Sequence, residues 1–215
     1  MGNKTIKICN LYCEIGGNRK LWSGDIEVTA IEIDKEIAKI YQDLFPNDKV
    51  IVTDAHQYLL EHFKEFDFIW SSPPCPSHSR FRLLWSGNPD KITNRTTGQS
   101  FKFPDMKLYE EIIFLTAFFK GKFVVENVIS YYEPLIKPIE MESHYFWTNF
   151  IIIPKKRVVR NIRRNNDKNF KKWNFDLSNI NLPSRVRQQI LNNLIKPELG
   201  LHIFNMAFKE PQRTL

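Results

Sequence analysis

The sequence predicts an α/β fold in which a mostly parallel β-sheet carries helices on both faces. Strand-like and helix-like segments alternate strictly over residues 1–130, and this alternation is typical of βαβ units. The composition agrees, since 215 residues with 42% hydrophobic and 26% charged side chains are ordinary for a globular domain. Polar residues also cluster where the expected strands end, and the active site of such a sheet lies at that edge.

The strands are recognised by β-branched and aromatic residues between turn signals. Five of them are expected, at residues 4–12, 27–34, 49–52, 67–72 and 122–128. Helices are expected between them, after the glycine turn at 14–17 and at 35–45, 56–63 and 104–121. The last of these starts with Pro and Asp and ends at a glycine, which are start and stop signals.

The pattern changes from Tyr132 onward. Residues 143–153 are expected to form a strand or hairpin arm, and residues 184–210 two helices, the second of which returns to the sheet. The chain therefore divides into a core at 1–154, a small basic insert at 155–185 and a C-terminal helical segment at 186–215.

The net charge of +7 is concentrated in the insert, where nine basic residues and one acidic residue lie between Pro154 and Trp173. This density of Lys and Arg favours a polyanionic partner, because phosphate contacts supply affinity through counterion release. A solvated basic loop is the alternative. No apolar run is long enough to cross a bilayer and the N-terminus has no apolar signal core, so we expect a cytoplasmic protein without membrane contact.

The strand-end residues of the predicted sheet are expected to converge on one cleft. Glu32 follows the glycine turn at the distance of an acid that holds ribose hydroxyls in nucleotide-binding sheets, and Asp54 is placed to accept from an adenine amine. For both acids a helix N-cap or a solvated loop residue is the alternative. Glu126, in "VVENV", is a carboxyl in an apolar setting that is expected to keep its proton near neutrality.

Three cysteines are present, at 9, 13 and 75, and their spacing fits neither a zinc site nor a disulfide framework, so no metal is expected. Cys9 lies within the first strand and is best interpreted as a core residue, and Cys13 lies at the turn, where it lines a pocket at most.

Cys75 differs from the other two cysteines, because the prolines of "SSPPCPSHSR" restrict the backbone around it. Arg80, Arg82 and His78 lie close to it in the sequence and are expected to stabilise its thiolate. A Cys/His pair also suggests a hydrolase, but no downstream pattern supports an acyl-transfer site.

The motifs "NLYCEIGG", "PPCP" and "ENV", in this order and spacing, resemble those of the DNA cytosine-5 methyltransferases. "SHYFWTNF" resembles a strand of the vertebrate de novo members, and "LNNLIKPEL" resembles the family's late Gly-Asn-Ser helix motif. The resemblance covers nearly the whole chain except the basic insert. It implies a Rossmann-like, class I S-adenosylmethionine-dependent methyltransferase fold, with the core as catalytic and cofactor-binding region and the insert as target-recognition region.

The resemblance also implies a reaction, in which S-adenosylmethionine gives a methyl group to C5 of a cytosine flipped out of double-stranded DNA. The Cys75 thiolate adds to C6, Glu126 acts at N3, and His144 takes a place near the base. The residues implied in cofactor binding are Asn10, Tyr12, Glu14, Gly16, Gly17, Glu32, Ile33, Asp54, Ala55, Pro73 and Asn193. The residues implied in nucleic-acid binding are Ser77, Arg80, Arg82, Lys155, Arg157, Arg160, Arg163 and Arg164.

Several positions depart from the family pattern. Glu14 and Asn192 replace glycines, and Asn10 replaces an aspartate. Glu142 and His144 stand where the family has two arginines, one of which reaches the target base, so His144 is expected to supply a donor to the cytosine unless this function is missing.

The short insert predicts a short or relaxed target sequence, in a restriction-modification or phage setting, with a homodimer or partner subunit as one way to complete the DNA-binding face. Two alternatives stay open. One is an RNA cytosine-5 methyltransferase, and the other is an inactive methyltransferase fold that binds nucleic acid.

Overall fold

The protein is described by a computed structural model that covers residues 4–79, 103–154, 175, 187, 190–191 and 193–208. A seven-stranded sheet forms its centre, in the order β3-β2-β1-β4-β5-β7-β6. The strands are β1 (Ile6–Leu11), β2 (Ile26–Glu32), β3 (Lys49–Val52), β4 (Phe68–Ser71), β5 (Lys122–Val128), β6 (Ile139–Met141) and β7 (His144–Thr148). Strands β1 to β5 pair in parallel and only β7 pairs antiparallel, with β5 and β6. The predicted α/β fold with a mostly parallel sheet is confirmed.

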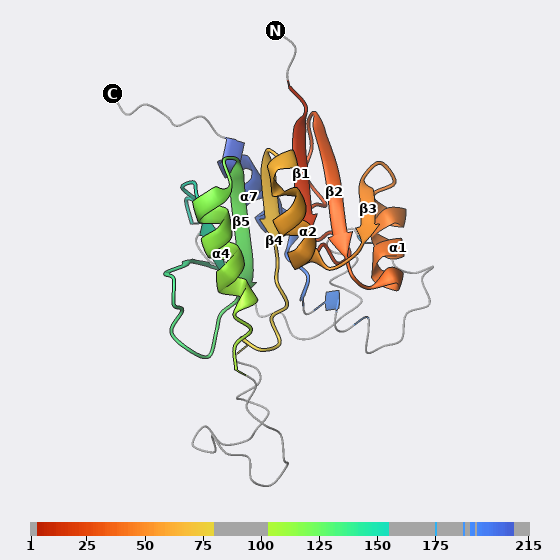
Figure 1. Ribbon diagram of the computed structural model, residues 1–215. Coiled ribbons are helices and arrows are strands. Elements are labelled where there is room, and N and C mark those ends of the chain that lie inside the picture. Colours follow the sequence, from red (N-terminus) through yellow and green to blue (C-terminus); the bar gives the residue numbers. More distant parts are fainter. Residues whose placement is uncertain are drawn as a thin grey trace, which may run out of the picture.

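Helices cover both faces of this sheet, as predicted (Figure 1). The helices are α1 (Lys35–Leu44), α2 (Ala55–His62), α4 (Lys107–Phe118) and α7 (Pro197–Phe208), with a 3₁₀ turn at Phe63–Glu65. Helices α2 and α4 pack on the side of Cys9, Ile69 and Phe123, whereas α7 packs on the opposite side. Figure 1 shows α2 and α4 in front of the sheet and α7 behind it.

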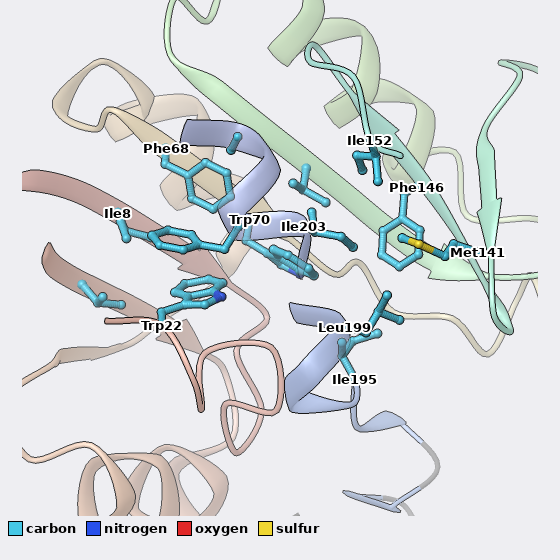
Figure 2. Packing of buried hydrophobic residues seen from close by; sticks show 14 residues of the cluster. Ile8, Trp22, Phe68, Trp70, Met141, Phe146, Ile152, Ile195, Leu199 and Ile203 are labelled. Carbon is cyan, nitrogen blue, oxygen red and sulfur yellow. The ribbon is translucent and has the colours of Figure 1, made fainter. Parts of the chain in front are cut away.

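The predicted return of the last helix to the sheet is confirmed by an aromatic cluster. Trp22 stacks on Phe204 of α7 with ring centroids 4.9 Å apart, and both rings contact Phe68 of β4 edge to face. Figure 2 shows Trp22, Phe68 and Trp70 converging on the segment that carries Leu199 and Ile203. Each of these large side chains is buried, and full burial of such a side chain is worth about 1.5–3 kcal/mol.

The prediction of a helix after the glycine turn is wrong. Residues 12–25, all described, form turns between β1 and β2 and contain no helix. Tertiary packing explains the difference, because Trp22 enters the core and its indole N–H reaches the Gly200 carbonyl at 3.3 Å. The backbone of Gly17 also lies so close to Leu194 and Ile195 that a side chain would not fit there.

Three further outcomes concern the rest of the chain. Strand β7 confirms the strand expected in 143–153, but its partner β6 was not expected. The positions of 187–193 that the structure describes are helical, in agreement with the first of the two C-terminal helices.

The basic insert lies outside the described residues apart from Phe175, which packs on α1 through Ile37 and Ile40. Within the described part of the chain, no helix combines the length and apolar character needed to cross a membrane.

Candidate active site

A cavity of about 400 Å³ lies at the carboxyl ends of the parallel strands. The loops after β1, β2 and β4, the end of β5, strand β7 and the segment before α7 contribute to its wall. The predicted site residues that line it are Tyr12, Glu14, Gly17, Glu32, Ile33, Pro73, Cys75, Glu126, His144 and Asn193. The strand-end residues therefore converge on one cleft, which is the position expected for an active site in this type of sheet.

A smaller cavity of about 140 Å³ continues the first one. Tyr12, Ile33, Pro73 and Pro74 belong to the walls of both. Asp54 and Ala55 line only the smaller cavity, together with residues of the α4 start such as Leu108. The two spaces form a cleft with a wide and a narrow compartment.

The proline loop that carries Cys75 is fixed by hydrogen bonds on both sides. The Asn127 amide donates to the Pro73 carbonyl at 3.0 Å, which ties the loop to the end of β5 beside Glu126. Beyond the cysteine, the N–H groups of His78 and Ser79 donate to the Cys75 carbonyl at 2.9 and 3.1 Å. Cys75 is therefore held at the cavity by a short, rigid turn rather than by the prolines alone.

The surroundings of Cys75 do not favour its thiolate. Burial, and after it the charge of Glu126, raises the pKa of the Cys75 thiol to about 11. The expected help from His78 is wrong, because burial lowers the pKa of that imidazole and its Nδ1 contacts the Tyr132 hydroxyl at 2.5 Å. Arg80 and Arg82 lie outside the described residues. The thiol is therefore protonated at neutral pH in the absence of ligands.

Glu126 faces the cavity with its carboxyl in a desolvated position. Burial raises the pKa of Glu126 to about 7, against the opposing effect of a hydrogen bond with Ser72. The expectation that this carboxyl retains a proton near neutrality agrees with its burial.

His144 is the neighbour of Glu126 on the adjacent strand β7, with Nε2 at 3.8 Å from Oε1. Burial lowers the pKa of His144 to about 4, so the imidazole is neutral and the contact is not an ion pair. Its Nδ1 is buried without a hydrogen-bond partner among the described residues. His144 is therefore a neutral ring at the cavity wall, with one buried nitrogen that has no partner among the described residues.

The turn after β1 is organised by two glutamates. Glu32 accepts the N–H of Glu14 at 3.1 Å with Oε2 and the N–H of Asp34 at 3.0 Å with Oε1. Glu14 adopts a positive φ of 47° and accepts the Asn193 amide at 2.8 Å with Oε1. The turn is thus connected to a residue near the C-terminal end of the chain.

Two predicted cofactor residues, Asn10 and Gly16, are not among the described residues that line the cavities. They contribute to the structure around this turn instead. Asn10 is fully buried and accepts the Asn18 amide at 2.8 Å. Gly16 has a φ of 77°, and a side chain there would overlap the rings of Phe45 and Tyr41. Their predicted direct role in cofactor binding finds no support in this geometry.

The alternative of a helix N-cap holds for Asp54. Its Oδ1 accepts the Gln57 N–H at 2.8 Å at the start of α2, yet the residue also lines the smaller cavity. Asp34 caps α1 in the same way.

The predicted nucleic-acid-binding residues are mostly outside the described part of the chain. This holds for Arg80, Arg82, Lys155, Arg157, Arg160, Arg163 and Arg164. Ser77 is described, and its hydroxyl accepts the Asp105 N–H at 3.0 Å, which joins the proline loop to the segment before α4.

A buried carboxyl below the cavity was not predicted. Glu111 of α4 is fully buried and accepts the Tyr12 hydroxyl at 2.6 Å, the Ser71 hydroxyl at 2.5 Å and His56 Nδ1 at 3.0 Å. The sequence contained a signal for it, because Glu111 shares a helical face with Leu108, Ile112 and Leu115. Among the described residues, no group of three or more His, Cys, Asp or Glu side chains is placed to hold a metal.

The fold and the cleft define an α/β protein whose strand-end cavity is lined by a thiol and a buried carboxyl. The family model of the C-5 cytosine-specific DNA methylases matches residues 6–129. This is more than half of the chain, and the protein belongs to that family, as the resemblance implied. A search of the curated proteins found no match.

Several solved structures are similar to the chain at low identity. A putative methyltransferase, yhhF, from Escherichia coli is 13% identical with a TM-score of 0.41, over 67% of this chain and 74% of that one. A mutant of DNMT2 from Spodoptera frugiperda is 22% identical with a TM-score of 0.38, over 57% of this chain and 35% of that one. The methyltransferase EhMeth from Entamoeba histolytica is 13% identical with a TM-score of 0.40, over 74% and 58%. This chain thus spans about a third of the Spodoptera protein's length.

Family membership implies S-adenosylmethionine as cofactor, and the cleft fits this group. The larger cavity is lined by four acidic residues, Glu14, Glu32, Asp34 and Glu126, and by no Lys or Arg among its described lining residues. Such a lining suits a ligand with a positive sulfonium. Glu14, at the wall of this cavity, also has a buried Oε2 that lacks a hydrogen-bond partner among the described residues.

Proposed function

We propose that this protein transfers a methyl group from S-adenosylmethionine to C5 of cytosine in double-stranded DNA, with Cys75 as the nucleophile. The observation that carries the proposal is the meeting of Cys75 and Glu126 in one cavity, with Glu126 buried so that it holds a proton near neutral pH. A thiol and a protonated carboxyl are the pair that addition to a cytosine ring requires.

In the proposed reaction the Cys75 sulfur forms a bond to C6 of the flipped base while Glu126 gives a proton to N3. This makes C5 nucleophilic. S-adenosylmethionine supplies the electrophilic methyl group. Transfer of the C5 proton to water then breaks the bond between C6 and Cys75, which leaves as the thiolate, and N3 returns its proton to Glu126.

The raised pKa of the Cys75 thiol means that the resting protein does not hold a reactive thiolate. The bond to C6 therefore forms only when the target cytosine has entered the cavity and the Cys75 thiol has lost its proton. His144, neutral and with Nδ1 unpartnered, is the proposed donor or acceptor to that base in place of the family's arginine.

The narrow compartment is the proposed adenine site. Ile33 and Pro73 supply apolar walls, and Asp54 supplies a carboxylate for an exocyclic amine. Glu32, which lines the wide compartment, is the proposed partner of the ribose hydroxyls. The wide compartment then holds the methionine end and the target base.

DNA is the proposed polyanion for the basic insert at 155–185, whose small size fits a short or relaxed target. Ser77, close to Cys75 in the proline loop, is a proposed contact to the DNA backbone, and a second copy or a partner subunit is a proposed way to extend that surface.

Covalent trapping tests the proposal. The protein is incubated with labelled S-adenosylmethionine and duplex DNA that contains 5-fluorocytosine, whose fluorine blocks the release of Cys75. We expect a labelled adduct that survives denaturing electrophoresis in the wild type and in Cys13→Ser, the control for a second thiol at the cavity, but not in Cys75→Ser. A tRNA with the same base tests the RNA alternative. DNA binding without an adduct on either substrate would contradict the proposal and favour the inactive fold.

A further inference from the structure

Glu14 occupies a backbone position that normally suits glycine. Its φ of 47° lies in the left-handed region, which side chains other than Asn and Asp rarely adopt. The motif "NLYCEIGG" has this glutamate where the family it resembles has a glycine. The turn therefore keeps its shape while a carboxyl is added to the cavity wall.

The added carboxyl is only half satisfied. Oε1 accepts the Asn193 amide at 2.8 Å, whereas Oε2 is buried and has no partner among the described residues. A buried oxygen without a hydrogen bond costs free energy, and such a group calls for an explanation. The Glu14 carboxyl therefore leaves one buried acceptor oxygen without a described partner at the wall of the cavity.

Among the described residues that line the cavity, the ionisable groups around Glu14 are acidic or neutral. Glu32 of β2, Asp34 before α1 and Glu126 of β5 are acids, Cys13 and Cys75 are thiols, and His144 of β7 is a neutral imidazole. Burial, followed by the charges of Glu32 and Glu126, raises the pKa of Glu14 to about 8, against the hydrogen bond from Asn193. Without a bound ligand, Glu14 is therefore mostly protonated at neutral pH.

We propose that Glu14 distinguishes the methyl donor from the product by charge. The Glu14 carboxylate forms opposite the positive sulfonium of S-adenosylmethionine. It is protonated again when methyl transfer has left the uncharged thioether of the product. The inference rests on the proposed function. Binding of the donor releases the Glu14 proton to solvent, and loss of the sulfonium charge after methyl transfer removes the attraction. The same residue thus favours entry of the donor and release of the product.

Calorimetry on the whole protein tests this inference without reference to catalysis. S-adenosylmethionine and S-adenosylhomocysteine are titrated into the wild type, Glu14→Gln and Asp34→Asn, between about pH 6 and about pH 9 and in two buffers of different ionisation enthalpy. Asp34→Asn is the matched control, because that side chain lines the same cavity but is already engaged as the N-cap of α1.

For the wild type and Asp34→Asn we expect proton release when the donor binds and none when the product binds. The ratio of donor affinity to product affinity is expected to rise about tenfold between about pH 6 and about pH 9, which corresponds to a change of about one unit in the pKa of Glu14 on donor binding. For Glu14→Gln we expect no proton release and a preference independent of pH.

Equal pH dependence for both ligands in the wild type, or an unchanged preference in Glu14→Gln, would overturn the inference and leave the proposed function standing. Binding of neither ligand to the folded wild type at any pH would overturn both.

Discussion

Replacement of Glu126 by Gln is expected to make the protein more stable and inactive at the same time. Glu126 is buried and its pKa is raised from 4.5 to about 7 by loss of solvation. The folded state therefore holds this proton up to about pH 7, whereas the unfolded chain loses it near pH 4.5. Stability from this group falls as the pH rises between these values and is constant above them.

The size of the effect follows from the two pKa values. The difference between 4.5 and about 7 corresponds to roughly 3 kcal/mol, at about 1.4 kcal/mol per unit. A neutral Gln of the same shape does not lose this free energy at high pH. For a chain of 215 residues, roughly 3 kcal/mol corresponds to an increase in Tm of roughly 6 to 12 °C.

Thermal unfolding at a series of pH values measures this difference. We expect Glu126→Gln and the wild type to unfold at similar temperatures near pH 4.5 and to separate as the pH approaches 7. Glu140→Gln, on the exposed side of β6, is the control and is expected to follow the wild type throughout. If Glu126→Gln followed the wild type at every pH, the carboxyl would not be desolvated as the structure indicates.

Two further predictions concern the proline loop. Cys75 is expected to react slowly with iodoacetamide at pH 7 and faster as the pH approaches about 11, since burial and Glu126 raise the pKa of its thiol; peptide mass mapping measures the rate, and fast alkylation at pH 7 would contradict the expectation. Asn127→Ala removes the buried donor to the Pro73 carbonyl and is expected to cost about 1–3 kcal/mol of stability. As Asn127 positions Cys75 from β5, this variant is also expected to slow formation of the 5-fluorocytosine adduct with little change in cofactor affinity, and an unchanged adduct rate would refute that role.

The parts of the fold that could be predicted from sequence depend on local patterns. The alternation of strands and helices fixed the parallel sheet, and the strand-end rule then placed Glu32, Cys75 and Glu126 at one cavity. The family motifs added His144 and Asn193, which come from elements late in the chain.

The failures share a physical cause, because each depended on contacts distant in sequence. The helix expected after the glycine turn is absent from the described residues 12–25 because Trp22 packs on α7. The hydrogen-bond partner of Trp22 there, Gly200, lies 178 residues further along the chain. The expected effect of His78 on Cys75 was judged from their spacing, but the imidazole contacts Tyr132 instead. Propensity and spacing carry no information on such side-chain directions.

The same reasoning explains why an acidic cleft is tolerated in this protein. Glu14 and Glu126 are both buried with raised pKa values, so the empty site stabilises the folded state less as the pH rises toward 8. A positively charged ligand offsets the part of that loss that comes from Glu14, because it binds the folded state and favours the ionised Glu14 carboxylate. It follows that the increase in Tm given by S-adenosylmethionine grows with pH, whereas that given by S-adenosylhomocysteine does not. Glu14, which weakens the ligand-free protein at high pH, is then the acid that makes binding of the charged donor favourable.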